Sequence, residues 1–434
     1  MTNGDLPSRG VVAPAPPDGV DPGSLPTQPT PSQAALTNYE PEEGRRGVAL
    51  CLSGGGFRAA LFHLGAVRRL NEMGMLGSVD TITSVSGGSI LSAHLAATMG
   101  SRWPAAGEVF APFDADVAGP FHEFCKRNIR TRPLLLGLAP WNLLRGSAAV
   151  AALEDQYYRH LTRLPLGALP AHPRFVFCAT DMAYGVNWTF TRDEVGSYQA
   201  GYAATPTTWT LARAVAASSS FPPLFNPQPV GLRPSELADG RDQAGSQRDR
   251  RVAGLRLSDG GVYDNMGLEP VWKNHAVVLV SDGGSTFDAG ADRGLLWRLN
   301  RYVEVQGHQS SAVRKRWLIS NFVNGILRGT YWGIGTEIEN YEIDARGYPA
   351  ALVGRVIAEI RTDMDRFEEP ERMVLENHGY LLADAAVRRY VTFLADGKAP
   401  PAHVPHPSYM DEDVAKGGLA ESSKRKLPFG RGWP

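Results

Sequence analysis

Residues 47–92 read GVALCLSGGGFRAALFHLGAVRRLNEMGMLGSVDTITSVSGGSILS and contain two strand–turn–helix patterns in succession. In the first, the apolar run Val48–Leu52 has the length of a strand, and Ser53 followed by three glycines ends it. Apolar residues then recur at helical spacing, which predicts a helix packed on a sheet. Its inner face comprises Ala60, Leu61, Leu64, Val67, Leu70 and Met73, and we expect Arg68, Arg69 and Glu72 to face solvent.

The second pattern places a serine at a sharp turn. Thr81–Val85 is typical of a strand, and the residues from Ser89 to Thr98 favour a helix, so Ser86 lies at the turn between them. The segment Ser84-Val85-Ser86-Gly87-Gly88 fits the nucleophile elbow G-x-S-x-G, with serine in place of the first glycine. A strained turn needs small neighbours, and Ser84 and Gly88 are small. The pattern therefore makes Ser86 a candidate nucleophile.

Strands and helices continue to alternate along the chain. The predicted strands are Arg174–Thr180, Val186–Thr191, Leu255–Ser258 and Ala276–Ser281, and the predicted helices are Thr208–Ala217, Asp292–Arg316 and Glu371–Leu394. This alternation predicts an α/β fold with a mainly parallel central sheet flanked by helices. Ligands of such folds bind beyond the carboxyl ends of the strands, where the two turns above lie, together with Asp259-Gly260-Gly261.

Three motifs together resemble those of the patatin-like phospholipase family. They are Gly54-Gly55-Gly56-Phe57-Arg58, then Ser84 to Gly88, then Asp259-Gly260-Gly261, in the order that the family shows. The resemblance extends from Gly47 to about Leu394 and implies a three-layer α/β architecture. It implies a lipid acyl hydrolase in which Asp259 accepts the proton of Ser86 directly, without histidine. Ser84, Gly87, Gly88, Gly260 and Gly261 would support these motifs.

The glycine-rich turn suits an oxyanion hole. The consecutive backbone N–H groups of Gly54, Gly55 and Gly56 can converge on a developing negative charge because no side chain obstructs them. Arg58 is expected to hold this loop or to add positive charge. A helix that begins just after Ser86 would also stabilise that charge through its dipole.

Other interpretations of the same residues stay open. A conventional triad would need a histidine after Asp259, and His275, His308 and His378 are available. Gly54-x-Gly56-x-x-Ala59 also fits a dinucleotide-binding turn, but the acid that this turn requires is missing from the end of the next strand, because Asp80 precedes that strand. A carboxylesterase or thioesterase acting on soluble esters, and a non-catalytic lipid-binding scaffold, are the remaining alternatives.

Composition argues against several classes of protein. The chain of 434 residues is 43% hydrophobic and 21% charged, with a net charge of -1, so nothing indicates nucleic-acid binding. Cys51, Cys125 and Cys178 are widely separated and are expected to be reduced core residues. No cluster of histidine and cysteine suggests a metal, and the proposed chemistry needs no cofactor. The expected partner is a phospholipid or another lipid ester, with peripheral contact to a membrane; oligomeric state and any activating partner stay open.

The pattern along the chain predicts three regions. Residues 1–45 form a proline-rich disordered arm, 46–396 the catalytic domain with an exposed loop at 229–251, and 397–434 a proline-rich, charged tail. The first residues lack a secretory signal, and no run of about 18 apolar residues occurs, so we expect a cytoplasmic protein.

Three further stretches have two interpretations each. The apolar stretch 132–144 either covers an acyl-chain entrance or is a buried connection. Residues 314–332 mix basic and aromatic side chains, which suits either a lipid surface or a core helix. Ser218-Ser219-Ser220-Phe221-Pro222-Pro223 resembles a serine- and proline-containing loop of the family, or simply ends a helix, and we assign these serines no chemistry.

Overall fold

The computed structural model describes residues 44–139, 147–222, 224–284, 294–395, 400–424 and 429–433. The predicted arm therefore lies almost entirely outside the described residues, as does the second half of the apolar stretch 132–144. The structured unit that follows begins at Arg45.

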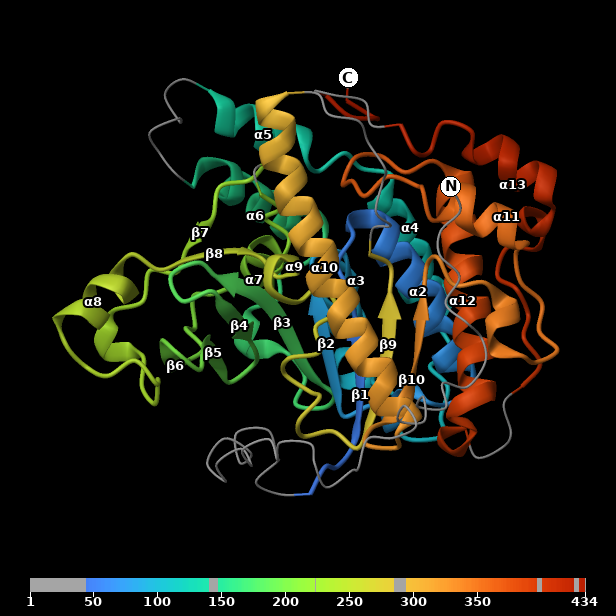
Figure 1. The fold of residues 1–434 in the computed structure, drawn as a ribbon, viewed down its shortest axis with the longest axis horizontal. Helices are drawn as coiled ribbons and strands as arrows, with labels where there is room; N and C mark the ends of the chain where they lie inside the picture. Colours follow the sequence, from blue (N-terminus) through green and yellow to red (C-terminus); the bar gives the residue numbers. More distant parts are fainter. Residues whose placement is uncertain are drawn as a thin grey trace, which may run out of the picture. The chain divides into compact units, whose positions relative to one another are not determined.

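A ten-stranded mixed sheet forms the centre of this unit (Figure 1). Five neighbouring strands are parallel: β10 (Arg328–Gly333), β9 (Val277–Asp282), β1 (Val48–Leu52), β2 (Thr81–Val85) and β3 (Arg174–Asp181). The others pair antiparallel: β4 (Val186–Phe190), β5 (Glu194–Ser197), β6 (Gly201–Ala204), β7 (Gln228–Pro229) and β8 (Arg256–Asp259). The predicted α/β fold with a mainly parallel central sheet is confirmed.

Helices cover both faces of the parallel strands. On one face α2 (Gly56–Glu72) and α12 (Glu369–Tyr390) lie side by side, and on the other face α10 (Leu295–Val323) crosses the strands (Figure 1). Strand β1 shows why both faces are buried: Leu50 and Leu52 belong to the larger core, whereas Ala49 and Cys51 pack with Leu318 of α10. Such a strand is apolar throughout, because successive side chains point to opposite faces.

The remaining helices connect or flank these layers. They are α3 (Gly87–Thr98), α4 (Gly119–Cys125), α5 (Thr131–Leu138), α6 (Ala148–His160), α7 (Leu211–Ser218), α8 (Ser246–Ala253), α9 (Gly261–Asp264), α11 (Ala350–Leu352) and α13 (Glu412–Leu419). In the part of the chain that the structure describes, no helix combines the length and the apolar character that crossing a membrane requires.

The prediction that Arg68 and Arg69 of α2 face solvent is wrong, whereas Glu72 is partly exposed. Arg68 and Arg69 are buried, and their guanidinium groups pair with carboxylates of α12: Arg68 Nε lies 2.7 Å from Glu376 Oε1, and Arg69 Nη2 lies 2.7 Å from Asp384 Oδ1. The two helices approach closely at Gly65, where a Cβ atom would lie 1.8 Å from the carbonyl oxygen of Glu376. A charged helix face indicates solvent only when no second helix supplies opposite charges.

Three segments for which the sequence predicted a loop, or allowed two interpretations, form helices or strands. The segment 229–251, predicted as an exposed loop, holds a 3-10 turn at Pro234–Glu236 and the first part of α8. Residues 131–138 form α5 despite Pro133, because proline is tolerated in the first turn of a helix. Residues 314–332 span the end of α10 and strand β10, in which Trp332 is fully buried.

The carboxyl-terminal region also contributes to the core. Ala415 and Leu419 of α13 are buried in the main core. All three cysteines are buried and free, as the sequence predicts.

Candidate active site

Ser86 occupies a strained turn between β2 and α3. Its backbone angles are φ 48° and ψ -111°, a region that non-glycine residues rarely adopt. Gly87 and Gly88 allow the turn, because a Cβ atom at Gly87 would lie 2.2 Å from the carbonyl oxygen of Gly56, and one at Gly88 would lie 2.1 Å from that of Leu52. The backbone of the glycine-rich loop therefore packs directly on the turn that carries Ser86.

Asp259 reaches Ser86 because two strands meet end to end beside β3. Strand β2 pairs with β3 up to Val85, opposite Cys178, and β8 pairs antiparallel with the next residues of β3, so that Asp259 is opposite Ala179. Strand β4 occupies the other edge of β3. The carboxyl ends of β2 and β8 thus converge, although 173 residues of sequence separate Ser86 from Asp259.

The Asp259 carboxylate is buried and accepts two hydrogen bonds. Only 3% of the residue is exposed, and burial raises its pKa to about 7 against the opposing effect of these bonds. The Gly261 N–H donates to Asp259 Oδ1 at 2.7 Å, and the hydroxyl of Ser86 donates to the carboxylate. A carboxylate with a pKa near neutrality and a hydroxyl bonded to it can accept a proton from that hydroxyl. Close packing explains the adjacent glycine: a Cβ atom at Gly260 would lie 2.5 Å from the Cys178 carbonyl oxygen.

The three glycines of the loop differ in their hydrogen bonds. Gly54 donates its N–H to the carbonyl oxygen of Asn265 at 3.0 Å, so this N–H is already engaged. Gly55 and Gly56 have φ angles of 144° and 59°, and in the described part of the chain their N–H groups meet no acceptor. A Cβ atom at Gly54 would lie 3.2 Å from Ser86 Cβ, which places the loop against the nucleophile candidate. Two of the three predicted donors are therefore available to an oxyanion.

Arg58, two residues after the glycine-rich turn, makes three hydrogen bonds to the backbone around it. Its guanidinium group is buried and donates to three backbone carbonyls, those of Gly283 at 3.0 Å, Ala358 at 3.0 Å and Ile360 at 2.8 Å. These bonds join the segment after β9 to the chain before α12. Of the two roles expected for Arg58, the geometry supports the first, holding the loop.

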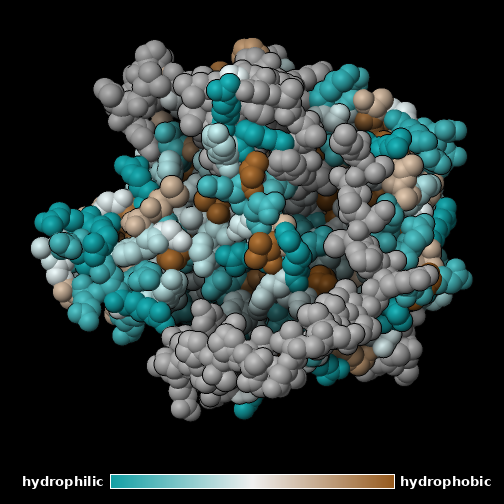
Figure 2. All heavy atoms as spheres, in the orientation of Figure 1, coloured by the Kyte–Doolittle hydropathy of each residue, from teal (hydrophilic) through white to brown (hydrophobic). Residues whose placement is uncertain are grey.

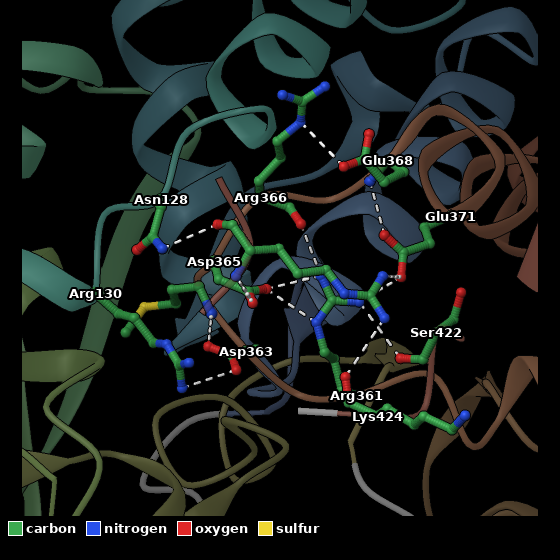
Figure 3. Close-up of polar contacts among 12 residues, drawn as sticks. Asn128, Arg130, Arg361, Asp363, Asp365, Arg366, Glu368, Glu371, Ser422 and Lys424 are labelled. Atoms are coloured by element: carbon green, nitrogen blue, oxygen red, sulfur yellow. Dashed lines mark hydrogen bonds and ion pairs between the residues drawn. The ribbon is translucent and has the colours of Figure 1, made fainter. Parts of the chain in front are cut away.

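A network of ion pairs joins Arg130 to the segment 361–371 and ties that segment together (Figure 3). The carbonyl oxygen of Asp363 accepts the N–H of Phe57 at 2.9 Å, directly after the three glycines. Its carboxylate pairs with Arg130 Nη1 at 2.9 Å, and both side chains are buried. Beside it, Arg361 Nη2 lies 2.7 Å from Asp365 Oδ1, and Arg361 also pairs with Glu371 (Figure 3). The short segment 361–371 is therefore fixed by charge as well as by packing.

The histidines considered for a triad make other contacts. His275 Nε2 lies 2.9 Å from the hydroxyl of Thr81, at the opposite end of β2 from Ser86, and His378 Nε2 lies 2.8 Å from the carbonyl oxygen of Ile334. His308 belongs to α10. The carboxylate of Asp80 accepts the N–H of Val48 at 2.7 Å, at the start of β1, so it is remote from the glycine-rich loop at the end of that strand.

One group of described residues has the donor types of a metal site. His122 Nε2 and His406 Nε2 lie 2.6 and 2.8 Å from the same oxygen of Glu376, and Arg68 Nε lies 2.7 Å from its other oxygen. One ligand atom from each of the three residues lies within 4.8 Å of the other two. Arg68 thus balances the buried charge of Glu376.

Two groups near Ser86 were missed by the sequence analysis. Asn265 accepts the Gly54 N–H through its backbone, and its side-chain oxygen lies 2.4 Å from the position of a Cβ atom at Gly54. Ser218, at the end of α7, accepts the N–H of Ser86 at 3.0 Å. The only signal for Ser218 was its place in a serine- and proline-containing loop, and nothing in the sequence relates it to Ser86, 132 residues away.

Comparisons with known proteins identify a family and several solved structures. A family model described as patatin-like phospholipase matches residues 50–272, just over half of the chain. Solved structures that match part of this chain include human GIVD cytosolic phospholipase A2 in complex with methyl gamma-linolenyl fluorophosphonate (14% identity, 87% of this chain and 59% of that chain, TM-score 0.42). Another is VipD from Legionella pneumophila (15% identity, 82% of this chain and 68% of that chain, TM-score 0.32).

The chain spans between 46% and 60% of the length of the human phospholipase chains that it matches. A search of curated proteins gives no match.

Proposed function

This chain belongs to the patatin-like phospholipase family, and we propose that it is a lipid acyl hydrolase whose catalytic pair is Ser86 and Asp259. The family implies cleavage of carboxylic esters of lipids. The observation that carries the residue assignment is the convergence of Ser86 and Asp259 at the ends of β2 and β8, where the Ser86 hydroxyl bonds a buried carboxylate whose pKa is raised to about 7.

The reaction follows from this geometry in two halves. The Ser86 oxygen attacks the ester carbonyl as Asp259 accepts the hydroxyl proton, and the N–H groups of Gly55 and Gly56 stabilise the oxyanion. The proton then passes from Asp259 to the leaving alcohol, which leaves an acyl group on Ser86. Water, deprotonated by Asp259, attacks this acyl-enzyme, so that the fatty acid is released and Ser86 recovers its proton.

Apolar side chains beside the catalytic pair support a lipid substrate. Phe221 and Leu224, just after the turn that contacts Asp259, are 54% and 43% exposed, and Val262, three residues after Asp259, is 45% exposed. Exposed apolar residues at a reactive centre favour a substrate with an acyl chain over a small soluble ester.

Peripheral contact with a lipid surface belongs to the same proposal. Apolar side chains interrupt the hydrophilic surface over α10 (Figure 2). Val313 and Val323 of α10 are 59% and 80% exposed, and Ile326 beyond its end is 56% exposed. Arg316 and Arg328 lie near them in the sequence, a combination suited to anionic headgroups.

The test compares fatty-acid release from phospholipid vesicles with hydrolysis of a short soluble ester. Ser86→Ala and Asp259→Asn should each abolish both activities while the proteins stay folded. Ser92→Ala is the matched control, because this serine lies on α3, which begins directly after Ser86, and its buried hydroxyl meets no hydrogen-bond partner among the described residues. It should retain wild-type rates. Activity on the soluble ester alone would identify an esterase, and a wild-type protein inactive on both substrates would favour a binding scaffold.

A further inference from the structure

The gap between β2 and β8 is bridged by the side chain of Ser218. Its oxygen accepts the N–H of Ser86 at 3.0 Å and lies 2.6 Å from the carbonyl oxygen of Cys178, to which the hydroxyl donates. Cys178 is opposite Val85 in the last residue pair between β2 and β3. The Ser218 hydroxyl thus lies between the N–H of Ser86 and the carbonyl of Cys178 and bonds to both, at the point where β2 ends its pairing with β3.

The N–H of Ser86 depends on this contact. Ser86 precedes the first residue of α3 and follows the last residue of β2, so neither element supplies an acceptor for it. Ser218 is fully buried, and its oxygen also lies 2.8 Å from the hydroxyl of Ser89 on α3. A residue with a φ of 48° keeps that conformation only when its surroundings fix it.

The same turn also holds the proposed base. The N–H of Gly260 donates to the carbonyl oxygen of Ser218, and the N–H of Asp259 donates to that of Ser220, both at 3.2 Å. The backbones of Ser86 and Asp259 are therefore attached to one three-residue turn, the first through a side chain and the second through the main chain.

We propose that Ser218 is a positioning residue that orients the Ser86 nucleophile toward Asp259. It touches neither substrate nor carboxylate and acts through the backbone of Ser86. The inference rests on the proposed function of the pair, and it assigns a role to a serine for which the sequence suggested none. The hydroxyl of Ser218 both accepts the Ser86 N–H and donates to the Cys178 carbonyl, which an alanine at this position could not do.

The experiment measures covalent labelling of the full chain by an alkyl fluorophosphonate, which reacts with activated serines. Ser218→Ala should label about 100-fold more slowly than wild type, the cost of a displaced reacting group, with kcat on a soluble ester reduced to a similar extent and KM unchanged. Ser218→Thr, which keeps the hydroxyl, should recover to within about tenfold of wild type. Ser92→Ala should label like wild type.

The outcomes separate this inference from the proposed function. If wild type is not labelled at Ser86, the proposed function fails and the inference fails with it. If wild type is labelled and Ser218→Ala reacts equally fast, only the inference is overturned. If Ser218→Ala does not fold, Ser218→Cys replaces it: the thiol, a weak hydrogen-bonding group, should react more slowly than Ser218→Thr, and equal rates would overturn the proposal.

Discussion

Hydrolysis should depend on pH through the ionisation of Asp259. The base accepts a proton only as a carboxylate, and burial raises its pKa to about 7. We expect kcat/KM for a soluble ester to rise with pH, to reach half of its plateau near pH 7 and to fall to about 1% of the plateau at pH 5, since one group with this pKa is about 1% ionised there. An exposed aspartate would give a flat profile over this range.

Ionisation of Asp259 should lower the stability of the fold as pH rises, although it raises the rate of hydrolysis. The pKa of Asp259 is higher in the folded state than in the unfolded chain, so the folded state binds the proton more tightly and unfolding becomes easier as pH rises from about 4 to about 7. A difference of roughly three pKa units corresponds to about 4 kcal/mol, reached in full above pH 7. Asp259→Asn removes this cost, so it should be inactive and yet more resistant to heat than wild type at pH 8.

The decisive comparison is thermal unfolding of wild type and Asp259→Asn at pH 5 and pH 8, beside the pH–rate profile of wild type. The melting temperature of Asp259→Asn should exceed that of wild type by more at pH 8 than at pH 5. A rate profile that is flat between pH 5 and pH 8, or a variant that is less stable than wild type at pH 8, would refute the reasoning. A midpoint near 7 that shifts in His275→Gln or His378→Gln would return a histidine to the mechanism.

Three other substitutions test the surroundings of the pair. Gly87→Ala should lower hydrolysis at least 100-fold in a folded protein, as judged by circular dichroism, because the new Cβ would push away the Gly56 carbonyl 2.2 Å from it. Glu376→Gln should destabilise the fold by up to about 3 kcal/mol in denaturant unfolding at pH 7, since it leaves buried Arg68 with only the exposed carboxylate of Asp114 as an ionic partner among the described residues. Because the pKa of Glu376 is held well below its usual range, this difference should shrink as pH falls below about 4. Arg58→Lys should lower kcat about tenfold and reduce the melting temperature, because one ammonium group cannot span three carbonyls.

The elements near the nucleophile could be predicted from the sequence because their signals are local. The predicted strands Val48–Leu52 and Thr81–Val85 are those observed, since an apolar run followed by a glycine turn determines both the strand and its end. The meeting of Ser86 and Asp259 was anticipated only through the family resemblance. No local sequence pattern indicates that β8 pairs with β3 directly beyond the end of β2, on the same edge.

The features that could not be predicted depend on partners distant in the chain. Arg68 and Arg69 have the periodicity of an exposed face, and only the carboxylates of α12 make their burial possible. The N–H of Gly54 would be an oxyanion donor by sequence, yet it is bonded to a carbonyl 211 residues later. Ser218 lacks a pattern of its own, because one hydroxyl placed between two backbone groups leaves no periodic signal.

The unfavourable contributions of the site to folding stability come mainly from Ser86 and Asp259, the two residues proposed to react. A φ of 48° at Ser86 costs on the order of 1–3 kcal/mol, and burial of the Asp259 charge costs about 4 kcal/mol at neutral pH. Their surroundings offset these costs with rigid, uncharged contacts: glycine backbones packed on Ser86, the Ser218 hydroxyl, and the Gly261 N–H. Among the described residues, the charged side chains near the loop are paired with each other, as Arg130 is with Asp363, and not with Asp259. A cation beside Asp259 would relieve its burial, but it would also lower its pKa and so weaken it as a base.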